Sequence, residues 1–484
     1  KGKGKGKKRK QSGGKGEGPE DGAGAGDAGA PAEKRARNDI WRETGDWELK
    51  NEAYEAYYRR QGVCPAEEWD RLLSALRSGL PVAIRVNRTR LGAAGLCERL
   101  REMREACAHD KDRELFAPVR LPWYPHDLAW HWPGLERRTV KKDKRNAQLK
   151  KYLMVREGSG LISRQEAVSQ IPPLCLGIEP HHDVLDLCAA PGSKTAQMIE
   201  MMHWPKAGAS SSAPRGMVMA NELQWKRANL LAHQVQRLGS PCAMVVNSDA
   251  QFFPELWVKE DGQDVQIKYD RILCDVPCSG DGTMRKTPYI WRSWTLRDGL
   301  SLHPYQLGIL NRGLDLLKVG GRLVYSTCSL NPVEDEAVVA AALARHGDAI
   351  ALVPPPELDG LRAAPGLERW VIQDPNGGPF FESFSQVPTE LRDCKSKIMP
   401  SMFPPAGEGT EGIGAALKNC RRLLPHLMDT GGFFVAVLEK RKELRASARV
   451  RREARHEEIK AERAQRDAAA AATEGADGAA VAAE

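Results

Sequence analysis

Long apolar runs are missing from this 484-residue sequence, in which no window approaches the roughly 18 to 20 apolar residues that a membrane-spanning helix needs. An apolar leader is missing too, so the 11 cysteines do not resemble the disulfide framework of a secreted protein. We therefore expect a soluble protein, without membrane contact, whose cysteines are mostly free thiols in a reducing compartment. The first residue is lysine, which is consistent with a fragment or a processed form.

Charge of one sign is in small excess, since the formal net charge is +8 at pH 7. The positive residues are nevertheless concentrated, in Lys1–Lys10 and again in Arg137–Lys151. Clustered lysine and arginine favour a polyanionic partner, although any one basic run is equally consistent with a solvated surface. Charge is therefore only a supporting argument.

Composition divides the chain into four segments. Residues 1–38 are rich in glycine, lysine and alanine and cannot bury enough apolar surface to offset chain entropy, which predicts a disordered basic arm. Residues 39–160 bring aromatic residues and helical spacing of apolar ones, which predicts a small α+β module. Residues 161–440 alternate short apolar runs with amphipathic stretches, which is typical of a doubly wound parallel sheet. Residues 441–484 are predicted to be a charged helix and a disordered alanine-rich tail.

Periodicity places the expected elements. The predicted strands are Pro81–Val86, Val184–Cys188, Met217–Ala220, Ala243–Val246, Arg271–Cys274, Arg322–Ser326 and, at the sheet edge, Gly431–Lys440. The predicted helices are Leu96–Cys107, Lys194–Met202, Gln224–Leu238, Pro304–Leu317 and Val333–Leu343. Aromatic residues of the small module are expected in its core, except in LPWYPHDLAW, Leu121–Trp130, where we expect a platform on which bases stack.

The first motif with chemical meaning is HHDVLDLCAAPGSKTAQ, His181–Gln197. A strand that carries Asp186 runs into small residues and then a helix, so the backbone can approach a ligand and helix N-terminal amides can face it. A dinucleotide fingerprint G-x-G-x-x-G is absent, and Ser193 stands where a P-loop requires glycine before its lysine. A turn with a purely structural role stays open.

Acidic residues follow the next strands. Glu222 ends the second strand, where a carboxylate can accept the ribose hydroxyls of a nucleoside. The distance in sequence from the glycine turn to Glu222 is longer than the roughly 20 residues expected between such a turn and its acidic residue. The insertion Lys206–Gly216 accounts for the difference. Asp249 follows the third strand, suited to an adenine amino group, and Asp275 follows the fourth. Each acid alone would be a surface carboxylate, but together they favour a nucleoside pocket.

Two cysteines follow strands of the same sheet. YDRILCDVPCSGDGTMRK places Cys278 after one strand, and GGRLVYSTCSLNPVEDE places Cys328 after another, so both thiols should lie at the sheet's active edge. Such thiols suit methylation of cytosine C5, a poor nucleophile that is activated when a thiolate adds to C6. The second thiol could assist release, Asp275 could hydrogen-bond N3, and Lys194 could help with charge and orientation.

Two other interpretations of these cysteines remain. Each could be an ordinary buried thiol, which is the commoner use of a free cysteine. A metal site at Cys274 and Cys278 is disfavoured because close C-x-x-C pairs and histidine partners are absent. We therefore expect no metal.

At these residues the sequence resembles the NOL/NOP/Sun family of RNA cytosine-5 methyltransferases, and most closely its eukaryotic tRNA branch. The resemblance runs from about Trp41 to Lys440 and includes EAYYRRQG, LPWYP, ISRQEAVSQIPPL, CAAPGSKTAQ, DVPCSGDGT, STCSLNPVEDE, KIMPSMFPP and TGGFFVAVLEK. It implies an α/β fold, in which a Rossmann-like class I methyltransferase domain with a seven-stranded doubly wound sheet follows a smaller N-terminal α+β RNA-binding module.

The resemblance also implies a reaction, which is methyl transfer from S-adenosyl-L-methionine to C5 of cytosine in RNA, with tRNA as the expected substrate. It implies that Cys328 attacks and that Cys278 serves release, the reverse of DNA cytosine-5 methyltransferases, where the Pro-Cys thiol attacks. The cofactor-binding residues that it implies are Cys188, Ala189, Ala190, Pro191, Gly192, Ser193, Lys194, Glu222, Asp249 and Asp275.

Two other functions stay open, a DNA cytosine-5 methyltransferase with Cys278 as nucleophile and a non-catalytic RNA-binding or ribosome-assembly factor. The basic arm and the small module are expected to hold the RNA backbone, with the target base flipped into the pocket. The basic clusters at Lys7–Lys10 and Lys34–Arg37 suggest nuclear import, so we expect the nucleus, with the nucleolus and the cytoplasm as alternatives.

Overall fold

The computed structural model describes residues 48–107, 117–136, 147–204, 214–392 and 397–444. The predicted basic arm at 1–38 and nearly all of the predicted tail at 441–484 lie outside these residues. Contacts divide the chain at Lys50, and every element named below belongs to the unit that begins there. Across the described residues, no helix has both the length and the apolar character that crossing a bilayer would require.

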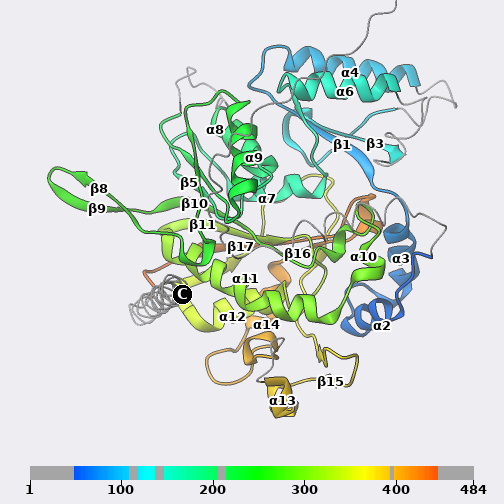
Figure 1. The fold of residues 1–484 in the computed structure, drawn as a ribbon, viewed down its shortest axis with the longest axis vertical. Helices are drawn as coiled ribbons and strands as arrows, with labels where there is room; N and C mark the ends of the chain where they lie inside the picture. The colour runs from blue at the N-terminus through cyan, green and yellow to red at the C-terminus, as the bar shows by residue number, and fades with distance from the viewer. Residues whose placement is uncertain (1–47, 108–116, 137–146, 205–213, 393–396, 445–484) are drawn as a thin grey trace, which may run out of the picture. The chain divides into compact units, whose positions relative to one another are not determined.

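A four-stranded antiparallel sheet occupies the N-terminal part of this unit. Its strand order is β2-β3-β1-β4, formed by Val119–Arg120, Ala129–Glu136, Pro81–Val86 and Ile162–Ser163. Helices α4 (Ala93–Cys107) and α6 (Ala147–Gly158) lie side by side over it (Figure 1). Leu100 of α4 and Leu153 of α6 share one apolar core with Ile84 of β1, and this core continues into one face of the large sheet described below.

The aromatic residues of Leu121–Trp130 belong to that core. Trp123, Tyr124 and Trp130 are 3%, 2% and 1% exposed. The expectation of a base-stacking platform is therefore wrong, because the rings fill the space between sheet and helices and leave no face for a base.

Helices α2 (Glu52–Gln61) and α3 (Trp69–Arg77) precede the small sheet in sequence but pack elsewhere. The apolar spacing in α3 buries Trp69 and its helical neighbours, as the sequence predicts. The Tyr54 ring of α2 lies 5.5 Å from Trp291 and 5.3 Å from Trp294, centroid to centroid, in the segment around α10 (Ile290–Ser293). The first helix of the unit thus packs against its large C-terminal part.

The large sheet has nine strands. Its order is β13-β16-β17-β11-β10-β5-β6-β7, and β12 also pairs with β17. The bounds are Val184–Asp186 (β5), Val218–Asn221 (β6), Ala243–Val246 (β7), Tyr269–Asp275 (β10), Leu317–Thr327 (β11), Ile350–Val353 (β12), Ala364–Pro365 (β13), Arg421–Leu423 (β16) and Phe433–Lys440 (β17). The strands from β11 to β7 run parallel, and β17 is antiparallel to β11. The two-residue β13 and three-residue β16 extend the seven strands expected.

Helices cover both faces of this sheet (Figure 1). Val184 of β5 packs with α7 (Ile171–Leu176), α8 (Ser193–Met202) and α9 (Trp225–Gln236), whereas Leu185 packs with α11 (Leu296–Leu316) and α12 (Glu336–His346). Successive residues of a strand face opposite sides, so a run that is apolar at every position is buried on both. The predicted doubly wound sheet is confirmed.

Several boundaries differ from the prediction. Strand β17 lies inside the sheet and not at its edge, because β12 and β16 pair with its outer side. Helix α11 begins eight residues before Pro304, at a capping box in which Thr295 and Asp298 exchange hydrogen bonds. The hairpin β8–β9 was not predicted. The remaining elements are β8 (Leu256–Glu260), β9 (Gln263–Ile267), β14 (Ile372–Gln373), β15 (Phe380–Phe381), α13 (Thr389–Arg392), α14 (Ile413–Ala416) and α15 (Pro425–Met428).

Candidate active site

The parallel strands bring the sequence-predicted residues to one edge of the large sheet. Because β5, β6, β7, β10 and β11 run in one direction, their carboxyl ends meet there. Glu222, Asp249, Asp275 and Cys328 all lie at or just after such an end. Residues that are spread over more than 100 positions of the sequence therefore share one region of the fold.

The turn between β5 and α8 holds the predicted glycine loop. Cys188, Ala189, Ala190 and Pro191 form the turn, Gly192 is the N-cap of α8, and Ser193 and Lys194 are its first residues. Gly192 has φ 103°, and a Cβ there would lie 3.0 Å from Leu231 Cδ1 of α9. Glycine is therefore required both by the left-handed backbone and by the close approach of α9.

Arg227 of α9 joins this loop to the acid after β6. Its guanidinium donates to the Ala190 carbonyl at 2.7 Å and lies 3.4 Å from the Glu222 carboxylate. Glu222 is 4% exposed and also accepts from the Gln224 backbone N–H at 3.0 Å. Asp249 makes the same kind of contact, since its carboxylate accepts from the Gln251 N–H at 2.9 Å.

Lys194 and Asp275 form an ion pair, with Nζ 2.8 Å from Oδ2. The other Asp275 oxygen accepts from Ser326 Oγ at 2.8 Å, two residues before Cys328. Burial lowers the pKa of Lys194, but the charge of Asp275 and its hydrogen bond outweigh burial, so the net pKa is raised. A negative charge on Cys328 raises the pKa of Lys194 further.

The two cysteines face one another across the ends of β10 and β11, and their Sγ atoms are 3.3 Å apart. Backbone bonds hold the loops, since the Gly282 N–H donates to the Cys328 carbonyl at 3.0 Å and the Gly432 N–H donates to the Gly282 carbonyl at 2.8 Å. The pKa of Cys278 is raised well above its usual value, because its thiol hydrogen-bonds Cys328 and is buried. Cys278 therefore retains its proton.

A comparison with known families shows which family the chain belongs to. Residues 173–439 match the family described as 16S rRNA methyltransferase RsmB/F, over more than half of the chain. The chain belongs to this family. The resemblance seen in its motifs is confirmed.

Members of known activity are similar over most of this RsmB/F chain. A multisite-specific tRNA:(cytosine-C(5))-methyltransferase of Saccharomyces cerevisiae is 42% identical over 418 residues, covering 85% of this chain and 58% of the relative. A tRNA (cytosine(34)-C(5))-methyltransferase of Drosophila melanogaster is 43% identical over 403 residues, covering 80% and 52%. The chain thus spans little more than half the length of these relatives.

Solved structures share the fold of this family member. A methyltransferase homolog of Pyrococcus horikoshii has a TM-score of 0.51 and 25% identity, covering 79% of this chain and 93% of the homolog. NSun6 from the same organism, solved with SFG, has a TM-score of 0.53 and 18% identity, covering 82% and 99%. The predicted class I methyltransferase fold is confirmed.

Sequence reasoning assigned no role to two buried acids in the family motifs, Asp281 and Glu334. Both are 0% exposed and lie next to the cysteine loops. In the sequence, Glu334 and the two acids after it resemble the acidic first turn of a helix, which is a common and exposed arrangement. The position of these three acids shortly after the Thr-Cys motif was the one sequence feature that could have indicated a role near the cysteines.

Proposed function

We propose that this chain transfers a methyl group from S-adenosyl-L-methionine to C5 of cytosine in RNA, and that tRNA is the substrate. The observation that carries the proposal is the 3.3 Å pair of thiols at the sheet edge that also bears the glycine turn. The names of the yeast and fly relatives support cytosine C5 and tRNA.

The residues present fit the cofactor. The Glu222 carboxylate is buried at the end of β6 and held by Arg227, as a group that accepts ribose hydroxyls should be. The turn Cys188–Lys194, together with Asp249 and Asp275, would complete the site. When bound, S-adenosyl-L-methionine supplies the methyl group.

Cys328 would be the attacking thiol. Cys278 retains its proton, since its pKa is raised by the hydrogen bond to Cys328 and by burial, so it can donate to a Cys328 thiolate. The Lys194 ammonium would attract the same thiolate. The assignment of attack to Cys328, and not to Cys278 as in DNA cytosine-5 methyltransferases, rests on the resemblance of the Thr-Cys motif to that of RNA cytosine-5 methyltransferases.

The steps follow from these positions. The Cys328 thiolate adds to cytosine C6, and electron density moves toward N3 and C5. Lys194 and Asp275 would hold the ring at N3 as its charge changes. Once C5 has been methylated, the C5 proton passes to water acting as base, the C–H electrons restore the C5–C6 double bond, and the Cys328 thiolate leaves C6. Cys278, 3.3 Å away, would assist that release.

The test is methyl incorporation by purified protein into tRNA, ribosomal RNA and DNA of matched cytosine content, followed by bisulfite sequencing. The proposal expects 5-methylcytosine in tRNA that requires added S-adenosyl-L-methionine. Incorporation into DNA alone would establish the DNA enzyme instead. Cofactor binding without incorporation into any RNA would support a non-catalytic RNA-binding factor.

A further inference from the structure

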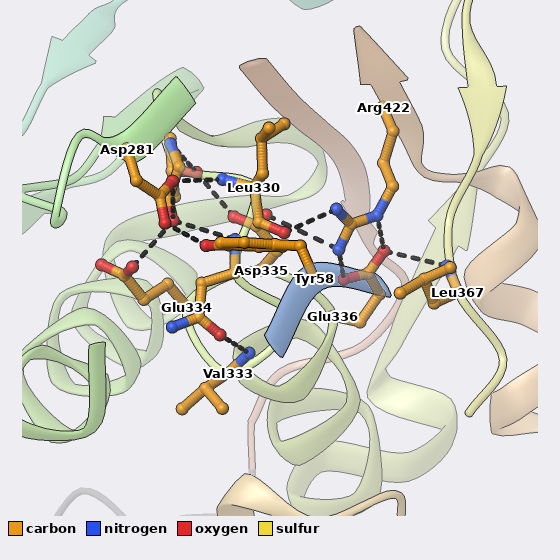
Figure 2. A network of polar contacts seen from close by, with 12 residues as sticks. Tyr58, Asp281, Leu330, Val333, Glu334, Asp335, Glu336, Leu367 and Arg422 are labelled. Carbon is orange, nitrogen blue, oxygen red and sulfur yellow. Dashed lines mark hydrogen bonds and ion pairs between the residues drawn. The ribbon is translucent and has the colours of Figure 1, made fainter. Parts of the chain in front are cut away.

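Glu334, which lies beside Asp281 in Figure 2, links the two cysteine loops. Its Oε1 accepts from the Ser279 backbone N–H at 2.8 Å, beside Cys278, and from Gln306 Nε2 at 3.0 Å. Its Oε2 accepts from the Ser279 hydroxyl and, at 2.7 Å, from the hydroxyl of Ser329, beside Cys328. One carboxylate thus binds the residue that follows each cysteine.

Asp281 makes a second link between the same loops. It belongs to the Cys278 loop, and its Oδ1 accepts from the Leu330 backbone N–H at 2.8 Å and from Ser329 Oγ at 3.1 Å. Its Oδ2 accepts from Trp294 Nε1 at 3.3 Å. The loops are therefore joined through two acidic side chains, both of which bind the Ser329 hydroxyl.

A third member comes from the distant helix α2. The Tyr58 hydroxyl donates to Asp281 Oδ2 across 223 positions of sequence, as Figure 2 shows. Its neighbour Tyr57 donates to Asn331 Oδ1 at 2.8 Å, two residues after Ser329. Helix α2, which precedes the small sheet in sequence, therefore touches both cysteine loops.

Because these side chains are buried, losing their hydrogen bonds would be energetically costly. Tyr58, Asp281 and Glu334 are 1% exposed or less, and a buried carboxylate costs free energy unless its oxygens accept hydrogen bonds. Burial and the charge of Asp281 raise the pKa of Glu334 to about 7. The bonds between the loops are thus the way in which these acids are accommodated, and moving either loop would break them.

We propose that Asp281, Glu334 and Tyr58 are positioning residues that hold Cys278 and Cys328 at reactive separation. The proposal rests on the proposed function for its catalytic meaning, but the separation of the thiols can be measured without RNA or cofactor. None of the three residues touches a sulfur. Glu334 and Asp281 act through the residues that follow the cysteines, and Tyr58 acts through Asp281.

The test uses disulfide formation between the two thiols. Diamide takes up two protons and two electrons from a thiol pair, and mass spectrometry of the Cys278–Cys328 peptide gives the rate. Asp281→Asn keeps the shape but lacks one acceptor oxygen, and we expect cross-linking to slow about tenfold. Tyr58→Phe removes a single hydroxyl and is expected to slow it about threefold without unfolding.

Glu334 offers a matched pair of variants. Glu334→Ala removes both oxygens and should slow cross-linking as Asp281→Asn does. Glu334→Gln keeps one acceptor oxygen and should slow cross-linking less than Glu334→Ala does. Glu200→Gln controls for lost stability, because it breaks the buried ion pair with Arg85 outside the two loops and should cross-link like the wild type.

Activity provides the second readout. Asp281→Asn and Tyr58→Phe should lower kcat for methyl transfer while KM for tRNA changes little. Wild-type cross-linking and kcat in folded Asp281→Asn and Tyr58→Phe would overturn the proposal. Slower cross-linking in these variants, alongside a wild-type protein inactive on every RNA, would leave the positioning role standing and remove the proposed function.

Discussion

The Sγ atoms of Cys278 and Cys328 lie 3.3 Å apart, although 50 positions of sequence separate the two residues. Parallel pairing of β10 with β11 places both at one sheet edge, and the bond from Gly282 to Cys328 holds the loops together. Two thiols at this distance can share a hydrogen bond and reach the same base. One can therefore attack while the other assists release.

The Lys194–Asp275 pair gives a first prediction. Lys194→Met removes the ammonium that pairs with Asp275, and we expect the single-turnover rate of methyl transfer to fall by about 10²-fold. Lys318→Met is the matched control. Lys318 of β11 pairs with Asp270 of β10 at 2.9 Å, near the ends of these strands that lie opposite the active-site edge. A Lys194→Met protein as fast as the control would exclude a role for this charge.

Much of this site follows from the sequence because parallel topology leaves little choice. Short runs that are apolar at every position predict strands buried on both faces, and the residue after each such run must lie at one edge. That reasoning placed Lys194, Asp275, Cys278 and Cys328 together.

Contacts between distant segments could not be predicted in this way. No periodicity connects Tyr58 with Asp281, and nothing local distinguishes Trp123 as core from Trp123 as a stacking surface. Pro304 misled the prediction of α11, since proline is common at the start of a helix, whereas the capping pair Thr295 and Asp298 marks the true start.

A second prediction concerns Gly282. A Cβ there would lie 2.7 Å from the Gly432 carbonyl oxygen and 2.8 Å from that of Cys328, both of them backbone atoms. Gly282→Ala should therefore lower the free energy of unfolding by about 1–3 kcal/mol and separate the cysteine loops. Denaturant titration measures the first effect and diamide cross-linking the second.

Gly95→Ala serves as the control for this substitution. A Cβ at Gly95 of α4 meets nothing within 4 Å, so the variant should be unchanged or stabilised by up to about 1 kcal/mol. Equal stability of Gly282→Ala and Gly95→Ala would show that the loops do not need the close backbone approach.

Asp186 gives a prediction about pH. Burial is the largest cause that raises its pKa, from 3.8 to about 7, with a smaller contribution from the charge of Asp275. Between these two values the folded chain holds more protons at this site than the unfolded chain, so its contribution to stability falls as pH rises. Asp186→Asn should remove that contribution.

The measurement is the unfolding free energy of wild type and Asp186→Asn at several pH values from about 4 to 7.5. The variant should gain relative to the wild type as pH rises through this window. Some pH dependence will remain in both proteins, since the pKa of Glu334 is also raised to about 7. A difference between the two proteins that is constant with pH would contradict the assignment.

The most direct test of the account is the covalent complex between protein and RNA. Wild type, Cys278→Ala and Cys328→Ala are incubated with tRNA and S-adenosyl-L-methionine, and adducts are resolved on denaturing gels. The account predicts that Cys278→Ala accumulates the adduct and does not turn over, whereas Cys328→Ala forms none. An adduct that persists in Cys328→Ala and disappears in Cys278→Ala would reverse the roles of the two thiols and contradict the account.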